Sequence, residues 1–337
     1  MTQTCAHPFD STASTLQQLT AMGDRTTDRS DSPAPPDGRG AATALEPPFE
    51  LSLPKSPPVP VLISVPHAGR AYSDDLRGRM RDPEFCAMRL EDRHVDALAR
   101  EVAQATGAGL LVAHAPRALI DLNRASDDVD WDMVIGGAPR GQRRSFANRR
   151  SRAGLGLVPR RLHGMGEIWN RRLTRAELEE RIAGVHQGYH RQLGLALETI
   201  RDRWGVALLI DLHSMPPLRR RVPHEAPAEF VIGDRFGASC DAALSARALA
   251  HLGSVGRVAA HNRPYAGGYI LDRHGQPGRG IHALQVEVCR ATYLDARLSE
   301  PSARMPAIAR VLSGLVRDLA ACTVTLGREP GFMLAAE

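Results

Sequence analysis

The chain lacks several features that would assign it to a common protein class. No apolar stretch approaches the ~20 residues of a membrane-spanning helix, and the opening residues MTQTCAHPFD lack the basic and apolar regions of a secretory signal. The five cysteines are scattered and form no CxxC pair, which argues against a disulfide framework and a cysteine zinc site. We therefore expect a cytoplasmic protein with no membrane partner.

Aromatic residues make up only 4% of the chain, which leaves little surface for stacking nucleic-acid bases. The formal net charge of +5 comes mostly from arginine, and eight arginines lie between Arg140 and Arg161. We interpret this stretch as a solvated basic loop, which could also attract a small anionic substrate. A non-catalytic protein that binds nucleic acid through this stretch is one alternative, although no nucleic-acid partner is expected.

Proline is concentrated near the start of the chain, where 10 of the 24 prolines fall in the first 60 residues. The run DRTTDRSDSPAPPDGRGAA has too few apolar residues to offset the entropy of ordering it. We predict that residues 1–50 form a disordered tail and that residues 51–330 form a single catalytic domain. The sequence does not indicate an oligomeric state.

The remaining chain alternates strand patterns with helical patterns. Short apolar runs rich in β-branched residues predict buried strands, at 59–65, 109–116, 206–213, 230–234 and 283–288. Helical spacing predicts helices, at 84–106, 174–204, 238–252 and 300–322. Thr174, with Glu177 three residues later, predicts a capping box at the start of the longest helix. This alternation predicts a three-layer α/β fold with a mostly parallel sheet.

Polar residues stand within or just after three of these strands. His67 follows one strand, Asp211 and His213 lie in another, and Glu287 lies in the last. Ligands bind at the carboxyl ends of the strands in such sheets, and histidine is a common metal ligand. The spacing therefore indicates a metal or acid–base site, whereas a single histidine of this kind is more often a hydrogen-bonded core residue.

From about residue 60 to 297 the chain resembles the N-formylglutamate amidohydrolase family. Seven segments carry the resemblance in the family's order: SVPHAG (64–69), EDRHVD (91–96), DLNR (121–124), GLGLVPRR (154–161), DLHSMP (211–216), NRPYAGGYI (262–270) and LQVEVCR (284–290). The family is distantly related to zinc carboxypeptidases. The resemblance thus implies a carboxypeptidase/phosphorylase-hydrolase-like α/β/α sandwich with a mixed sheet and one divalent metal, usually zinc.

The resemblance also implies a metal site. His67 and His213 resemble the two imidazole ligands, but Arg70 stands where carboxypeptidases supply the glutamate of His-x-x-Glu. Within the acidic segment 91–96, Asp92 is the position that resembles the family's acidic residue. Asp96 and His94 remain alternatives, and the segment could also be a solvated helical face.

Further roles follow from the resemblance. Glu287 occupies the place of the carboxypeptidase general base, although a buried ion pair with Arg290 would also explain it. Asn123 and Arg124 resemble the pair that binds the substrate carboxylate, although Asn123 could instead help to polarise the scissile carbonyl. Arg290 is a candidate for a second carboxylate, and Tyr265 is a candidate substrate contact.

The implied reaction is hydrolysis of N-formyl-L-glutamate to formate and L-glutamate, a late step of histidine breakdown in the family. A related hydrolase of another N-acyl amino acid or short peptide is the closest alternative. His186 and His190 show a spacing that can bind metal on a helix, but Gln187 replaces the glutamate of HExxH. For His190 we expect a structural hydrogen bond or one that supports the site.

Overall fold

The computed structural model describes residues 47–139, 149–220 and 226–328. Most of the predicted tail, through residue 46, lies outside the described residues, as do residues 140–148 of the basic stretch. The first strand begins at Phe49, two residues before the predicted start of the domain. The four cysteines in the described part of the chain are free thiols, and no helix there is long and apolar enough to cross a membrane.

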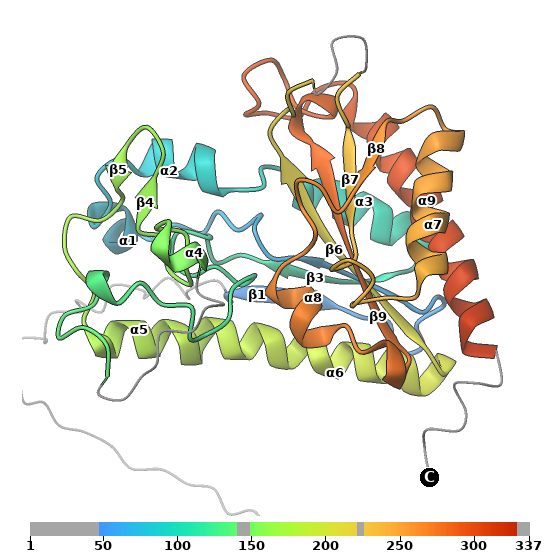
Figure 1. Ribbon diagram of the computed structural model, residues 1–337, viewed down its shortest axis with the longest axis horizontal. Coiled ribbons are helices and arrows are strands. Elements are labelled where there is room, and N and C mark those ends of the chain that lie inside the picture. Colours follow the sequence, from blue (N-terminus) through green and yellow to red (C-terminus); the bar gives the residue numbers. More distant parts are fainter. Residues whose placement is uncertain (1–46, 140–148, 221–225, 329–337) are drawn as a thin grey trace, which may run out of the picture. The chain divides into compact units, whose positions relative to one another are not determined.

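The core of the described chain is a seven-stranded mixed sheet (Figure 1). Its order is β1-β3-β2-β6-β9-β7-β8, and the central strands β3, β2, β6 and β9 are parallel. The strands are β1 (Phe49–Ser52), β2 (Val61–Val65), β3 (Gly109–Ala113), β6 (Ala207–Met215), β7 (Phe230–Gly233), β8 (Ala259–His261) and β9 (Ile281–Cys289). β1 runs antiparallel to β3, and β7 runs antiparallel to β9.

Helices cover both faces of this sheet. The helices are α1 (Asp74–Gly78), α2 (Pro83–Leu90), α3 (Val95–Thr106), α4 (Arg149–Arg152), α5 (Arg175–Arg181), α6 (Gln187–Trp204), α7 (Ala242–Ser254), α8 (Tyr269–His274) and α9 (Met305–Arg328). α3, α7 and α9 pack on one face, while α6 and α8 pack on the other (Figure 1). The predicted α/β fold with a mixed sheet between helical layers is therefore confirmed.

Successive side chains of the central strands point to opposite faces of the sheet, and both faces are buried, which explains their continuous apolar sequence. In β2, Val61, Ile63 and Val65 join the core beneath α3 and α9, whereas Leu62 joins the core beneath α6. Both faces are buried, so neither face needs polar residues. Asp211, His213 and Glu287 interrupt this pattern on β6 and β9.

The predicted long helix over 174–204 is present, and its capping box is confirmed. The Thr174 hydroxyl accepts a hydrogen bond from the Glu177 N–H, and the Glu177 carboxylate accepts one from the Thr174 N–H. One π-helical turn, Ile182–His186, separates α5 from α6. The helix ends at Gly205, whose left-handed conformation suits a C-cap glycine.

The helix predicted over 84–106 is wrong in its middle, because it is two helices separated by residues 91–94. In this break the Asp92 N–H donates to the His67 carbonyl at 2.9 Å, and His94 adopts a left-handed φ of 57°. Glu91 and Asp92 are buried rather than solvated. This tertiary contact overrides the local helical spacing and places Asp92 beside the end of β2.

A small subdomain fills the chain between β3 and α5. It contains α4, a 3₁₀ turn at Trp131–Met133 and a short hairpin made of β4 (Arg161–Leu162) and β5 (Gly166–Glu167). These elements lie beside α1 and α2 in Figure 1. Part of the basic stretch is structural here, since Arg160 forms ion pairs with Asp130 and Glu167.

Candidate metal centre and cavity

Sheet register brings two of the predicted site residues together. β6 and β9 are parallel neighbours in which His213 pairs directly with Glu287, so both side chains leave the same face of the sheet. His67 lies two residues beyond the end of the adjacent strand β2. The carboxyl ends of three central strands thus supply these residues to one place.

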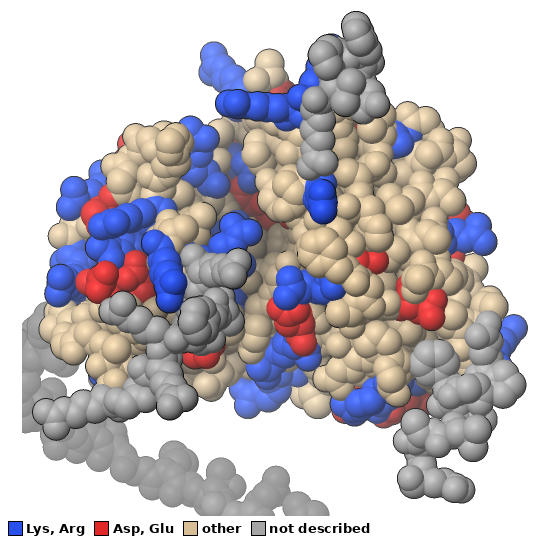
Figure 2. All heavy atoms as spheres, viewed as in Figure 1, with Lys and Arg blue, Asp and Glu red and all other residues tan. Residues whose placement is uncertain are grey.

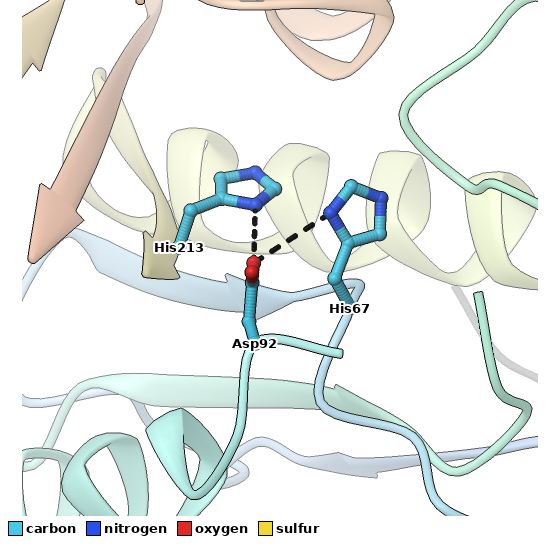
Figure 3. Close-up of side chains that lie close together, drawn as sticks. All are labelled: His67, Asp92 and His213. Carbon is cyan, nitrogen blue, oxygen red and sulfur yellow. Dashed lines mark hydrogen bonds and ion pairs between the residues drawn. The ribbon is translucent and has the colours of Figure 1, made fainter. Parts of the chain in front are cut away.

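His67, Asp92 and His213 converge with their ligating atoms within 4.8 Å of one another, and all three are buried. Figure 3 shows both imidazoles facing the Asp92 carboxylate. Its Oδ2 lies 3.6 Å from Nδ1 of His67 and 2.9 Å from Nδ1 of His213. Two histidines and one carboxylate in this arrangement could hold a divalent metal ion.

The two alternative ligands have other partners. Asp96 forms a two-bond ion pair with Arg70, at 2.9 and 3.0 Å. Nε2 of His94 lies 3.5 Å from a carboxylate oxygen of Glu300. Within the described residues, Asp92 is the member of the acidic segment that groups with the two histidines.

A second carboxylate orients each histidine from outside the group. Nε2 of His67 bonds Asp121 Oδ1 at 2.7 Å, and Nε2 of His213 bonds Asp211 Oδ2 at 2.8 Å. Ligand histidines typically make such bonds through the nitrogen that does not face the metal. These contacts leave both Nδ1 atoms pointing toward Asp92.

The position of His213 between Asp92 and Asp211 also favours a cation. A neutral imidazole has one N–H, so both contacts are hydrogen bonds only when the ring is protonated. Burial alone would lower the pKa of His213, but Asp211 and Asp92 raise it well above its usual 6.5. A metal at Nδ1 would replace this second proton, because ligands bind metal in their deprotonated form. The residues therefore fit a metal ion.

Arg290 fixes the third member of the group. Its Nη2 donates to Asp92 Oδ1 at 3.3 Å and to the Glu91 carbonyl, while Nε donates to Ser214 Oγ at 3.1 Å and Nη1 to the Met88 carbonyl at 3.3 Å. Four of the five N–H groups of Arg290 are thus used within the protein. Burial would raise the pKa of Asp92, but bonds from the two histidines hold it well below its usual range.

Glu287 is buried beside the group, where its Oε1 accepts a hydrogen bond from Gln285 Nε2 at 2.9 Å. Burial raises the pKa of Glu287 to about 7. The positive charge of His213 opposes this rise, and the negative charges of Asp92 and Asp211 add to it. A carboxyl group with a pKa near neutrality can both accept and return a proton.

The DLNR segment forms a tight turn against the histidines. Asp121 accepts hydrogen bonds from Arg117 Nε at 2.9 Å and from the Asn123 N–H at 2.9 Å. The Asn123 amide lies 3.3 Å from His213 Nε2 and accepts the N–H of Ile270 at 2.9 Å. This turn therefore links the outer partner of His67 to the vicinity of His213.

Arg124 projects from the same turn and is mostly buried. Its Nε donates to the Leu155 carbonyl at 3.0 Å and its Nη1 to the Asn123 carbonyl at 2.8 Å. Among the described residues, none accepts a hydrogen bond from Nη2 of Arg124. Burial lowers the pKa of Arg124, and the negative charge of Asp121 partly opposes this change. The guanidinium nevertheless remains charged at neutral pH.

These side chains line one cavity of about 330 Å³. Its walls include His67, Asp92, His213, Glu287, Asn123, Tyr265 and five arginines, Arg89, Arg117, Arg124, Arg150 and Arg290. Figure 2 shows a hollow near the middle of this face with basic side chains around it. Such a cavity suits a small anionic substrate.

The proposed substrate contact Tyr265 lies in the wall of this cavity, half buried. Burial raises its pKa, and the negative charges of Glu287 and Asp92 raise it further. The phenol therefore keeps its proton and can act as a hydrogen-bond donor.

Several residues of the site were not predicted. Asp121 lies within the DLNR motif, and Asp211 was noted only as a polar residue in a strand. Nothing in the sequence indicated that these two carboxylates bond the histidines. Arg117 and Arg89 carry no local pattern at all. His186 and His190 bond backbone carbonyls, and no group of potential metal ligands in the described residues includes them.

Comparisons with known proteins identify the family of the chain. The family profile described as N-formylglutamate amidohydrolase matches residues 59–294. The N-formylglutamate deformylases of Pseudomonas aeruginosa and Pseudomonas putida are 32% and 29% identical to the chain, covering 80% of it and 95% and 94% of their own lengths. The crystal structure of N-formylglutamate amidohydrolase from Ralstonia eutropha is 31% identical, with a TM-score of 0.70 over 83% of this chain and 97% of that one. The chain therefore belongs to the N-formylglutamate amidohydrolase family.

Proposed function

We propose that this protein hydrolyses N-formyl-L-glutamate to formate and L-glutamate, using one bound divalent metal ion, which we infer from the ligand types to be zinc. The observation that carries this proposal is the buried group of His67, Asp92 and His213 in an arginine-lined cavity. The names of the Pseudomonas relatives support the same substrate. We place the reaction in the cytoplasm, as a late step of histidine breakdown.

His67 and His213 would bind the metal through Nδ1, and Asp92 through a carboxylate oxygen. Asp121, Asp211 and the Arg290 contacts then hold these three ligands in place. A divalent ion held by these residues would polarise a carbonyl group and make a bound water molecule acidic enough to lose a proton near neutral pH.

Glu287 is the proposed general base. Its carboxylate takes a proton as water adds to the formyl carbon. It then delivers that proton to the amino nitrogen as the C–N bond breaks, which releases formate and L-glutamate. A pKa near 7 suits both transfers, because a general acid–base group works best with a pKa close to the working pH.

Arginine side chains would bind the two substrate carboxylates. Arg124 offers the N–H groups of Nη2, and we assign it to the α-carboxylate. Arg290 has one N–H left for a substrate, so we propose a single hydrogen bond there. Arg89 and Arg150 line the same cavity with exposed side chains and would add positive charge for the second carboxylate.

Asn123 and Tyr265 complete the proposed substrate contacts. Both line the cavity, and the Tyr265 phenol keeps its proton for donation. Their contribution would be to orient the formyl group rather than to change its charge.

A metal-linked activity assay tests this function. The purified protein should hydrolyse N-formylglutamate much faster than N-acetylglutamate. It should lose activity on chelation and regain it with about one equivalent of zinc, as expected of a single catalytic site. Comparable rates on the two substrates would replace the proposal with a broader N-acyl amino acid hydrolase. Full activity of the metal-free protein would contradict the proposed role of the metal.

A further inference from the structure

Three consecutive carbonyls of the DLNR turn each accept a hydrogen bond from a side chain. His190 Nε2 donates to the Leu122 carbonyl at 2.9 Å, and His186 Nε2 donates to the Arg124 carbonyl at 2.8 Å. Between them, Nη1 of Arg124 donates to the Asn123 carbonyl at 2.8 Å. The two histidines lie one turn apart on the long helix, so a single rigid element holds both sides of Asn123.

These bonds define the protons on the imidazoles. A carbonyl only accepts, so Nε2 carries the proton in both His186 and His190. Nδ1 of His190 is then an acceptor, and its partner at 3.0 Å, Nε2 of His274, is the donor. Burial lowers the pKa of all three histidines, which keeps them neutral. The rings also pack together, with the His186 and His190 centroids 4.4 Å apart.

The same helix supports the metal group through the residue next to His190. The Tyr189 hydroxyl lies 2.9 Å from Ser64 Oγ, which donates to Asp211 at 3.1 Å, and Asp211 orients His213. The π-helical turn Ile182–His186 ends at His186 itself, three residues before Tyr189, and such turns occur often at functional sites. Tyr189 therefore supports the metal group through Ser64, while the adjacent His190 holds the DLNR turn.

The consequence for Arg124 is geometric. Its Nε and Nη1 are bound to the carbonyls of Leu155 and Asn123, so the direction of its remaining Nη2 end follows from the position of the turn. The charge-assisted hydrogen bonds that Nη2 can give a carboxylate tolerate little displacement, because each N–H must point at its acceptor oxygen.

We propose that His186 and His190 are positioning residues for substrate recognition. By binding the Leu122 and Arg124 carbonyls, they fix the turn and aim Arg124 at the substrate α-carboxylate. They neither ligate the metal nor move a proton in the reaction. This inference rests on the proposed function, because it assigns Arg124 to a substrate carboxylate.

Substitution of the histidines tests the inference with two substrates, N-formylglutamate and its α-amide. In His190→Leu and His186→Leu, kcat/KM for N-formylglutamate should fall roughly tenfold to a hundredfold, mainly through KM, as expected when a polar contact is misaligned. The α-amide should change less than about threefold, because it never makes the carboxylate contact. Metal content should stay at the wild-type level. His190→Gln, which keeps an N–H donor, should recover most of the lost selectivity.

His251→Ala provides a matched control. His251 also bonds a backbone carbonyl, that of Val311 at 3.2 Å, but it lies on α7 against α9, on the other face of the sheet. Its loss should lower thermal stability without changing the ratio of kcat/KM between the two substrates. Equal losses on both substrates in the His190 variants, or no loss on either, would overturn the inference.

Hydrogen exchange provides a readout that needs no substrate. The Asn123 and Arg124 amides bond Asp121 in the intact turn. They should exchange faster in His190→Leu but not in His251→Ala. Unchanged exchange would overturn the inference by itself. If the wild-type enzyme does not hydrolyse N-formylglutamate, the proposed function fails instead, and hydrogen exchange still decides the positioning role.

Discussion

Replacing Glu287 with glutamine should make the metal-free protein more stable while removing most of its activity. Glu287 is buried on β9 beside Asp92 and Asp211, two further carboxylates. Glutamine has nearly the same shape, and its carbonyl oxygen can still accept the hydrogen bond from Gln285. The substitution therefore removes a buried charge without leaving a cavity.

The sign and size of the stability effect follow from the pKa of Glu287. Burial raises it from 4.5 to about 7. Between these values the folded chain binds more protons than the unfolded chain, so stability falls as pH rises, and the full cost is present above about pH 7. A difference of about 2.5 in pKa, at ~1.4 kcal/mol for each pKa unit, gives a cost of about 3 kcal/mol. Near pH 8 the free energy of unfolding of Glu287→Gln should exceed that of the wild type by this amount, and near pH 4.5 the two should be equal.

Urea denaturation of the metal-free proteins at these two pH values measures the effect. Glu300→Gln, a change at an exposed glutamate, serves as the control and should leave stability within ~0.5 kcal/mol of the wild type. With metal bound, Glu287→Gln should lose ~10² to 10⁴ in turnover. A variant no more stable than the wild type near pH 8 would refute the burial argument. A loss below about tenfold would refute the role of Glu287 as general base.

Three further changes probe other parts of the account. Arg124→Lys keeps the charge but not the planar fork, so kcat/KM for N-formylglutamate should fall roughly tenfold to a hundredfold, and an equal loss on its α-amide would contradict carboxylate binding. Gly268→Ala would place a Cβ 2.5 Å from Asn123 Oδ1, so we expect at least about tenfold lower activity with metal retained; unchanged kinetics would show that Asn123 is not needed in place. Burial lowers the pKa of His190 to about 2 and that of His274 to about 3, so each should reduce stability by up to ~1.4 kcal/mol per pH unit as pH falls from about 6.5 to 3. In urea denaturation, His274→Gln should show a shallower acid dependence, and an unchanged slope would contradict this.

The central strands could be predicted because their apolar runs are buried on both faces. The prediction that His213 and Glu287 lie at strand ends led to the candidate site, and the β6–β9 register sets these two residues side by side. The edge strands β1 and β8 were missed, since each is only three or four residues long and partly exposed. Such short strands take their conformation from the neighbour with which they pair.

The break between α2 and α3 could not be predicted from spacing. The helical pattern continues through the acidic segment, but in the structure the Asp92 N–H bonds the His67 carbonyl, 25 residues earlier in the chain, where the helix is interrupted. The same limit applies to Arg290. The sequence position of Arg290 did not indicate that its guanidinium would donate a hydrogen bond to Asp92, which lies 198 residues away in the chain.

The most direct test of the account is the metal content of His213→Ala measured together with its turnover of N-formylglutamate. We predict about one zinc per wild-type chain, by the logic of single catalytic sites, and neither bound zinc nor activity in the variant. His251→Ala, a histidine change on the other face of the sheet, should keep both. A His213→Ala protein that retains full zinc and full turnover would contradict the claim that His67, Asp92 and His213 form the catalytic metal site.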